Sequence, residues 1–338
     1  MEPAVRDRDS RQRDRPLRVA VIGAGGVGLG IGSCLLRSGA KVLFVVRDEQ
    51  GANALRTHGL ERTGVFGKVS FPPDRFEVDT RYARIASWNP DHVLVCTKTT
   101  ECDGVADALL TACAEPWSRR ASPPAIVLCL NGWGSAERFA ARFPAQQIFN
   151  ARVITGFRRD APFRVEITVH AEAIHIGSLH GADLASIEPL CRAIDVGGIP
   201  CAPSAEIERD LLAKLLYNCA LNPLAALRGV PYGAIGDDPA SRATLEAVVR
   251  EIFAVLDASS LATHWSTPDA YLAFFFDALL PPTREHESSM LQDLRAGRPT
   301  EIDALCGAVV GLGRAAGIAT PVNAALATLI RAIEPPRS

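Results

Sequence analysis

Residues 17–28, LRVAVIGAGGVG, decide the fold of this chain of 338 residues. A short apolar run leads directly into the pattern G-x-G-x-x-G, made by Gly23, Gly25 and Gly28. The first glycine permits a tight turn, the second lets the backbone approach a pyrophosphate, and the third lets a helix pack closely on the strand. The N-terminus of that helix then faces the anion. We therefore expect a dinucleotide cofactor to bind along the whole turn, at Gly23, Ala24, Gly25, Gly26, Val27 and Gly28.

The sequence that follows the glycines supports this interpretation. A helical stretch from Leu29 to Ser38 stops at Gly39, and a second apolar run occupies residues 42–46. A lone glycine triplet is weak evidence, but a triplet between strand and helix in a βαβ unit of this length strongly indicates a Rossmann-like domain. The alternative is a glycine-rich turn that binds no ligand.

The end of the second predicted strand indicates which dinucleotide is bound. NAD-binding proteins place an acidic residue there, which hydrogen-bonds the ribose 2′-hydroxyl. This chain has Arg47 at that position, followed by Asp48. An arginine pairs with a 2′-phosphate, which an acid would repel, so Arg47 favours NADP. Asp48 leaves NAD as the alternative.

Length and composition predict a soluble protein of two domains. The chain exceeds the usual size of a single core, and 48% hydrophobic and 22% charged residues are typical of a globular protein. A net charge of −2 provides no basic field for nucleic acid. No apolar run reaches the ~20 residues that cross a bilayer, so we expect no membrane partner.

The first 16 residues, MEPAVRDRDSRQRDRP, mix Arg with Asp and contain almost no apolar side chains. They lack the apolar stretch of a signal peptide, and we expect a disordered tail. Nine cysteines without a C-x-x-C motif fit a reducing, cytoplasmic location better than a disulfide framework. The seven histidines are scattered without ligand spacing, so we expect no metal site.

The first half of the chain alternates strand-like and helix-like segments. Residues 91–97 and 125–130 are continuous apolar runs, as expected of parallel strands covered on both faces, and residues 148–154 add another strand. Two β-rich runs, residues 165–169 and 173–176, predict an antiparallel hairpin.

From about Leu184 onward the pattern is helical. We expect these helices to be interrupted at Pro223, Pro231, Pro281-Pro282 and Pro299. The predicted fold class is α/β, with a Rossmann-like domain at residues 17–181 followed by an all-helical domain at residues 182–335. Ligands of open α/β sheets bind beyond the carboxyl ends of the strands, so the helical domain has to close that cleft.

Two strand ends place polar side chains at this cleft. Lys98 follows the run that ends at Thr97, and Asn131 follows the run that ends at Leu130. Taken singly, Lys98 could be an ordinary loop lysine and Asn131 part of a turn.

A stripe of polar residues marks an otherwise apolar helix, residues 211–222, LLAKLLYNCALN. Lys214, Asn218 and Asn222 are spaced by four and therefore project from one face. A buried ammonium without partners is unfavourable, and buried amides have to be hydrogen-bonded. Such a helix lines a cleft in which a polar ligand supplies the missing bonds. The alternative is a structural amide pair and a lysine whose head reaches water.

Two candidate helix starts follow near the C-terminus. Ser289 with Gln292 fits a capping box, and Thr300 with Asp303 fits a similar one. A helix N-terminus with a free hydroxyl is also suited to bind a substrate carboxylate.

Together these motifs resemble those of the ketopantoate reductase family. The matching elements run in family order from residue 17 to about 330: Gly23-x-Gly25-x-x-Gly28, Arg47, Lys98, Asn131-Gly132-x-Gly134, Lys214-x-x-x-Asn218-x-x-x-Asn222-Pro223, Ser288-Ser289-Met290-Leu291-Gln292-Asp293 and Thr300-Glu301-Ile302-Asp303.

The resemblance implies NADPH-dependent reduction of 2-dehydropantoate to (R)-pantoate, a step toward pantothenate and coenzyme A. Lys214 matches the family's proton donor. The role is chemically reasonable, because hydride addition builds negative charge on the carbonyl oxygen, which an ammonium stabilises and then protonates. Desolvation would lower the pKa of Lys214 toward the working range. Glu301 is implied to lie near Lys214 and the nicotinamide end, where it orients both.

The resemblance also implies the ligand contacts. Substrate would be bound by Asn131, Lys214, Asn218, Asn222 and Ser289. Besides the glycine turn, the cofactor would be contacted by Arg47, Lys98, Asn131, Glu301 and the backbone near Phe157. The family further suggests a homodimer formed through the helical domain.

Two positions depart from the family pattern. Tyr232 and His286 stand where many members carry an asparagine that helps to hold the polar end of pantoate. One alternative is therefore a reductase of a different small 2-keto acid. A second is a non-catalytic regulator that binds NADP, but a sensor has no need of the proton donor that Lys214 and Glu301 together indicate.

Overall fold

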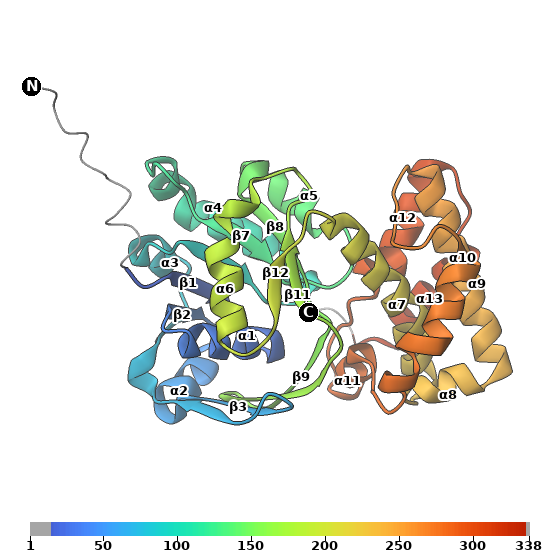
Figure 1. The fold of residues 1–338 in the computed structure, drawn as a ribbon, viewed down its shortest axis with the longest axis horizontal. Helices are drawn as coiled ribbons and strands as arrows, with labels where there is room; N and C mark the ends of the chain where they lie inside the picture. The colour runs from blue at the N-terminus through green and yellow to red at the C-terminus, as the bar shows by residue number, and fades with distance from the viewer. Residues whose placement is uncertain (1–14, 336–338) are drawn as a thin grey trace, which may run out of the picture.

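The computed structural model describes residues 15–335, which form an α/β part and a helical part lying side by side (Figure 1). The expected disordered tail, residues 1–16, lies outside the described residues except for its last two positions. Between residues 15 and 335, none of the helices is both long and apolar enough to cross a membrane.

The α/β part is built on a sheet of eight strands in the order β12-β11-β8-β7-β6-β1-β2-β5. Neighbouring strands are parallel except β8 and β11, which are antiparallel. The strands are β1 (Arg18–Ile22), β2 (Lys41–Val45), β5 (Glu77–Asp79), β6 (His92–Val95), β7 (Ala125–Leu128), β8 (Ile148–Arg152), β11 (Ile174–Gly177) and β12 (Cys201–Pro203). The predicted Rossmann-like fold is confirmed.

Alternate residues of β1 face two different cores. Val19 and Val21 pack in the core that includes α1 and α6, whereas Ala20 and Ile22 pack in the core that includes α3, α4 and α5. A strand covered on both faces has to be apolar at nearly every position, which explains the continuous apolar runs. The helices of this part are α1 (Gly26–Arg37), α2 (Glu49–His58), α3 (Ala83–Trp88), α4 (Cys102–Ser118), α5 (Ser135–Ala140) and α6 (Glu188–Val196).

A second sheet of four strands, in the order β4-β3-β10-β9, covers α1 from outside. Its strands are β3 (Leu60–Gly64), β4 (Val69–Phe71), β9 (Thr155–Ala161) and β10 (Arg164–His170). The hairpin predicted from residues 165–169 and 173–176 is wrong, because β10 pairs with β9 and β3 whereas β11 pairs with β8 and β12 of the large sheet. The true partner, β9, carries Arg158, Arg159 and Asp160, and it therefore lacks the apolar alternation that marks a strand in sequence.

The helical part surrounds α7 (Ile207–Arg228), which packs against α9, α11 and α13. The interruption predicted at Pro223 is wrong: α7 continues through this residue to Arg228. Burial of Leu221, Leu224 and Ala225 around the proline shows that tertiary packing outweighs the one backbone hydrogen bond that proline removes. The remaining helices are α8 (Tyr232–Asp237), α9 (Pro239–Ala258), α10 (Pro268–Phe274), α11 (Ser289–Arg295), α12 (Cys306–Ala316) and α13 (Pro321–Ile333).

The segment between the two parts differs from the expected division at residues 181 and 182. Helix α6 packs on α1, and β12 pairs with β11, so both elements belong to the α/β part. We propose that the boundary lies near Ile207, where α7 begins.

Candidate active site

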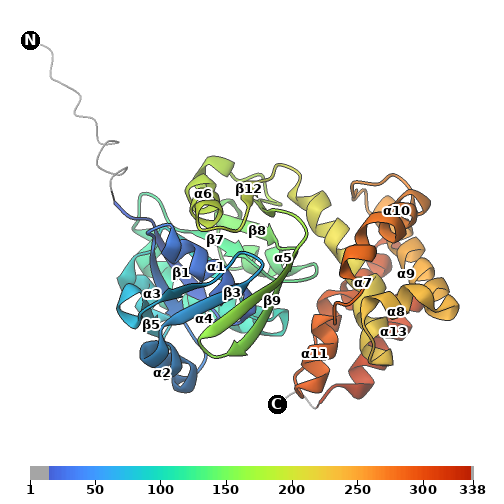
Figure 2. The same cartoon turned by 60° about the horizontal axis from the view of Figure 1, so that its bottom comes forward.

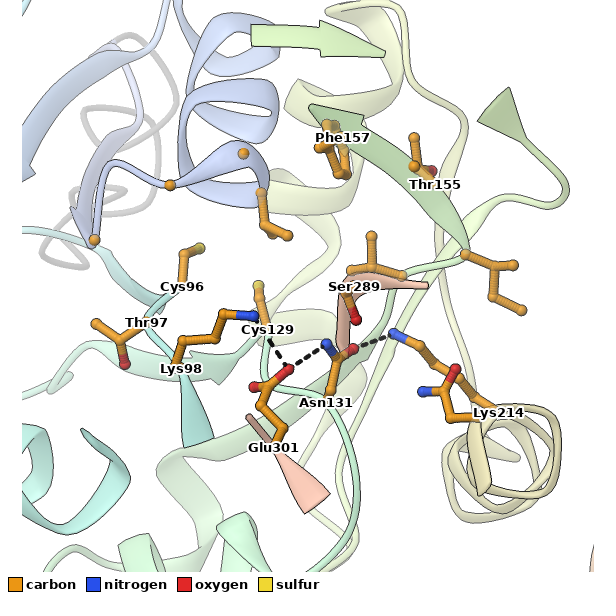
Figure 3. Close-up of a pocket in the computed structure, with 18 of the residues that line it drawn as sticks. Cys96, Thr97, Lys98, Cys129, Asn131, Thr155, Phe157, Lys214, Ser289 and Glu301 are labelled. Atoms are coloured by element: carbon orange, nitrogen blue, oxygen red, sulfur yellow. Dashed lines mark hydrogen bonds and ion pairs between the residues drawn. The ribbon is translucent and has the colours of Figure 1, made fainter. Parts of the chain in front are cut away.

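A cleft of about 1730 Å³ lies between the carboxyl ends of β2, β6 and β7 and the helical part. Helices α7 and α11 lie on the side of the helical part that faces the sheet (Figure 2). Every predicted site residue except Gly28 lines this cleft. The structure therefore brings together residues that are far apart in sequence, such as Lys98 and Glu301 (Figure 3).

The glycine turn leaves room for a ligand at one position only. Gly23 has φ +94°, and a Cβ on Gly28 would lie 1.9 Å from the carbonyl oxygen of Gly23, so both positions require glycine. A Cβ on Gly25 would meet no atom within 4 Å. Gly25 is also the N-cap of α1 and supplies no side chain to the free backbone N–H groups. Open space at an uncapped helix N-terminus fits the pyrophosphate of a dinucleotide.

The ring of Phe157 packs on α1. A Cβ on Gly30 would lie 2.2 Å from this ring, and a Cβ on Gly26 would lie 2.9 Å from the Cβ of Phe157. Phe157 also lines the cleft, and the expected contact of its backbone with a cofactor stays a prediction.

Arg47 and Asp48 differ in what they can offer a cofactor. The side chain of Arg47 is 82% exposed and lies 3.7 Å from Asp48 and 3.6 Å from Glu101. Asp48 accepts a hydrogen bond from the Gly51 N–H at 2.8 Å and caps α2. Asp48 therefore has a structural role, and Arg47, although near two carboxylates, keeps an exposed side chain that lines the cleft.

Glu301 belongs to the helical part, and its carboxylate contacts residues of the α/β part across the cleft. It is 6% exposed and accepts hydrogen bonds from the Thr99 N–H at 3.1 Å and from Asn131 Nδ2 at 2.9 Å. The ammonium of Lys98 lies 3.6 Å away. The segment that follows Glu301 packs closely on the loop after β7: a Cβ on Gly132 would lie 2.1 Å from the Ala304 carbonyl oxygen, which accepts a hydrogen bond from the Trp133 N–H at 2.9 Å.

Asn131 connects Glu301 to Lys214. Lys214 Nζ donates to Asn131 Oδ1 at 2.8 Å, and Asn131 Nδ2 donates to Glu301 Oε2 at 2.9 Å (Figure 3). An ammonium can only donate and a carboxylate can only accept, so the two neighbours fix which way the amide points. Lys214 contacts Glu301 through Asn131 and does not pair with it directly.

The surroundings shift the pKa values of the three charged groups. Burial lowers the pKa of Lys214 to about 8, with the positive charge of Arg152 acting in the same direction and Glu301 opposing it. Burial alone would raise the pKa of Glu301, but Lys98 and the hydrogen bonds from Asn131 and Thr99 lower it. Burial would lower the pKa of Lys98, but Glu301 and Asp293 raise it. The cleft thus combines two firmly charged groups with one lysine that releases its proton readily.

The two asparagines of the polar stripe on α7 differ in their side-chain hydrogen bonds. Asn222 Oδ1 accepts a hydrogen bond from the Tyr232 hydroxyl at 2.6 Å, so its amide N–H groups and one lone pair of Oδ1 remain for a ligand. Asn218 is 8% exposed, and its side-chain amide has no hydrogen-bond partner within residues 15–335. A buried amide without a partner that lines a cleft is suited to bind a polar ligand.

The predicted helix starts need correction. Ser288, and not Ser289, caps α11 by accepting a hydrogen bond from the Leu291 N–H at 3.0 Å. Both serines fit the sequence pattern, and the register of the first turn decides between them. This register leaves the Ser289 hydroxyl free at the cleft (Figure 3).

No α-helix begins at Thr300. Its hydroxyl accepts a hydrogen bond from the Ile302 N–H at 3.2 Å in a single 3₁₀ turn, η8 (Ile302–Ala304). Asp303 accepts a hydrogen bond from Arg331 of α13 at 2.7 Å and does not form a capping box with Thr300.

Two residues of the site are missed by the sequence patterns. Asp293 is buried and accepts a hydrogen bond from Lys98 at 2.6 Å, and Thr99 holds Glu301 through its N–H and hydroxyl. Asp293 lies in the motif that contains Ser289, but the spacing from Lys98 is 195 residues. No local pattern identifies such a pair.

The fold and this cleft define an oxidoreductase of the Rossmann-like class. Two family models match the chain: "Ketopantoate reductase PanE/ApbA" matches residues 19–181, and "Ketopantoate reductase PanE/ApbA C terminal" matches residues 206–334. The chain belongs to the ketopantoate reductase family.

Relatives over nearly the full length carry the same name. The chain is 29% identical to a 2-dehydropantoate 2-reductase of Aquifex aeolicus, with 94% of this chain and 97% of the relative covered. A 2-dehydropantoate 2-reductase of Halobacterium salinarum is 29% identical, with 93% and 98% covered.

Solved structures agree on the fold. A 2-dehydropantoate 2-reductase of Geobacter metallireducens has a TM-score of 0.81 at 29% identity, with 94% of this chain and 99% of that chain covered. A D-mandelate dehydrogenase solved with NADH and anilino(oxo)acetate has a TM-score of 0.80 at 20% identity, with 94% and 98% covered. At that identity the second likeness concerns the fold alone.

Proposed function

We propose that this protein reduces the keto group of 2-dehydropantoate to (R)-pantoate with NADPH, and that Lys214 is the proton donor. The observation that carries the proposal is the bridge from Lys214 through Asn131 to Glu301 at the carboxyl end of β7. A bound nicotinamide cofactor would supply the hydride. The protein then has to hold the carbonyl beside Lys214 and deliver one proton to its oxygen.

Lys214 is suited to both tasks. As a cation it stabilises the negative charge that develops on the carbonyl oxygen when the hydride adds to carbon. A pKa of about 8 leaves the group mostly protonated at pH 7 and makes it a stronger acid than an ordinary lysine. The proton moves from Nζ to the substrate oxygen and leaves a neutral amine, which solvent reprotonates.

Three further side chains are proposed to hold the substrate. Asn218 offers a whole free amide, Asn222 offers its N–H groups, and Ser289 offers a hydroxyl at the start of α11. Donors of this kind suit the carboxylate and the hydroxyl of a 2-keto acid. Glu301 and Asn131 would keep Lys214 oriented between turnovers.

NADPH is proposed over NADH because Arg47 stands at the end of β2 with an exposed side chain, and Asp48 is engaged as the cap of α2. Space over Gly25 fits the pyrophosphate. We further propose that the protein acts in pantothenate and coenzyme A synthesis in the cytoplasm, as a homodimer formed through the helical part.

A second candidate is a reductase of a different small 2-keto acid. It is favoured by the hydrogen bond from Tyr232 to Asn222, which engages an acceptor that could otherwise take a hydrogen bond from the hydroxyl of pantoate. His286 packs against the same tyrosine, with ring centroids 5.3 Å apart. A substrate without that hydroxyl would lose nothing in this pocket. A non-catalytic regulator would require that none of these acids is reduced.

The test is the loss of NADPH absorbance with 2-dehydropantoate, 3-methyl-2-oxobutanoate and benzoylformate, each repeated with NADH. Fastest turnover of 2-dehydropantoate with NADPH supports the proposal. Faster turnover of an acid without the hydroxyl supports the second candidate. No turnover with any acid, while NADPH still binds, overturns both.

A further inference from the structure

Three of the arginines that line the cleft of the glycine turn come from three separate elements. Arg47 follows β2, Arg159 lies on β9, and Arg298 follows α11 in the helical part; all three line the cleft. Arg159 Nη1 donates to the carbonyl oxygen of Ala24 at 3.2 Å, so its guanidinium lies against the turn itself. Within residues 15–335, no carboxylate lies at ion-pair distance from Arg159.

Arg298 reaches the same region from the opposite side of the cleft. Arg298 Nη2 donates to Asp293 Oδ1 at 2.9 Å, and Asp293 in turn accepts from Lys98 at 2.6 Å. Lys98 follows Thr97, whose methyl group lies 3.1 Å from the place of a Cβ on Gly23. A short series of contacts thus links Arg298 to the glycine turn.

The arginines repel one another. The pKa of Arg159 is lowered, first by burial and next by the positive charges of Arg298 and Arg47, and Asp48 offsets only part of this. Like charges grouped beside free backbone N–H groups are unfavourable unless an anion lies among them. Because the cations are spread from the end of β2 to the helical part, the anion they fit is an extended one with several negative charges.

We propose that Arg159 and Arg298 bind the pyrophosphate of the dinucleotide from opposite sides of the cleft, so that the cofactor connects the α/β part to the helical part. Arg47, at the end of β2, remains for the 2′-phosphate. The inference rests on the dinucleotide use proposed above and assigns two residues that the sequence motifs do not identify.

This division of roles predicts a pattern that a general loss of charge would not give. NADPH and NADH share the pyrophosphate, but only NADPH carries the 2′-phosphate. Loss of Arg159 or Arg298 should weaken both cofactors about equally, whereas loss of Arg47 should weaken NADPH and leave NADH nearly unchanged.

The test is a fluorescence titration of the full chain with NADPH and with NADH, without substrate, for the wild type, Arg159→Gln, Arg298→Gln and Arg47→Gln. Charge-assisted hydrogen bonds predict a rise in Kd of about tenfold or more for both cofactors in the first two variants. The matched control is Arg158→Gln, which removes the same charge from the neighbouring residue of β9. Arg158 pairs with Asp160 and Glu166, so its loss should change Kd by less than about twofold.

Arg298→Gln also removes a partner of Asp293, so Arg298→Lys is measured beside it. The lysine keeps the charge and should retain an affinity between those of Arg298→Gln and the wild type. Affinities of Arg159→Gln and Arg298→Gln within twofold of the wild type overturn the proposal, as does a loss confined to NADPH, or a wild type that binds neither cofactor. Because the titration needs no turnover, a protein that reduces no keto acid but shows this pattern overturns only the proposed reaction.

Discussion

The side-chain oxygen of Asn131 accepts a hydrogen bond from Lys214 Nζ at 2.8 Å, across the cleft between the sheet and α7. Asn131 follows β7, and Lys214 lies in the third turn of α7, so this contact joins the two parts of the molecule. Glu301 holds the other end of the same amide at 2.9 Å. The orientation of Lys214 therefore depends on a residue that itself carries no charge.

Replacing Asn131 should lower the rate of reduction without preventing folding. Asn131→Ala removes the only hydrogen bond of the Lys214 ammonium in the described residues, so the lysine loses its orientation and its pKa falls further. We expect kcat to fall about tenfold to a hundredfold, because a displaced proton donor is inefficient. Steady-state kinetics with NADPH measure this, and Asn150→Ala, in the neighbouring strand β8, is a control outside the cleft. An unchanged kcat would contradict the role of the bridge.

The rate of keto-acid reduction should fall as the pH rises through about 8, because Lys214 has to be protonated to donate a proton and its pKa is about 8. Below that value the ammonium is present and the rate should be flat. Measured profiles of kcat/KM, which report the pKa values of the free enzyme, test this between pH 6 and 10. A fall in rate that begins only at pH 10 or above would show that burial does not lower the pKa of this lysine.

Lys214→Met should make the protein inactive but more stable. The pKa of Lys214 is lower in the folded state than in the unfolded chain, so at pH 7 the folded state bears the cost of a desolvated ammonium. Removing it should raise the free energy of unfolding by roughly 1–3 kcal/mol. Urea denaturation at pH 7 measures the difference, which should shrink as the pH approaches 10. A variant that is less stable than the wild type at every pH would contradict the predicted gain in stability.

Asp210→Asn should destabilise the start of α7 in a pH-dependent manner. The carboxylate accepts hydrogen bonds from His175 at 2.9 Å, His264 at 2.9 Å and Ser204 at 2.8 Å, and these bonds lower its pKa against the opposing effect of burial. A depressed pKa means stability that is present above the ordinary value near 3.8 and lost as the pH falls below it. We expect a loss of about 1–3 kcal/mol at pH 7 that becomes smaller below pH 4.

Denaturation of Asp210→Asn and wild type at pH 7 and pH 3.5 checks this prediction. Asp269→Asn, which removes an exposed partner of Arg250, is the control and should change little. Equal losses for Asp210→Asn at both pH values would show that the carboxylate charge contributes nothing.

Tyr232→Phe should improve the use of a hydroxylated keto acid. The substitution releases Asn222 Oδ1, which then accepts a hydrogen bond from the substrate. The KM for 2-dehydropantoate should fall several-fold, whereas the KM for 3-methyl-2-oxobutanoate, which has no hydroxyl, should stay the same. Equal changes for both acids would mean that Tyr232 does not select the substrate.

Much of the site could be predicted from local patterns. Gly25, Lys98 and Asn131 each follow a strand of the same parallel sheet, and such ends meet at one edge. The stripe on α7 follows from helical spacing alone. The helix start at Ser288 was misplaced by one residue, because two adjacent serines satisfy the same capping pattern.

The errors and omissions have a common physical cause. The partner of β10 and the continuation of α7 past Pro223 depend on contacts made only after the chain has folded, and no short pattern records them. The same holds for Asp293, which meets Lys98 across 195 residues. Long-range pairing decides these features, whereas periodicity reports only the local conformation.

The most direct test of the account compares Lys214→Ala with the wild type, in both NADPH titration and turnover of 2-dehydropantoate. The account predicts that kcat falls by about a thousandfold or more while the Kd for NADPH changes by less than about threefold, because Lys214 acts on the substrate carbonyl. A variant that still turns over within about tenfold of the wild type would contradict the assignment of Lys214 as the proton donor.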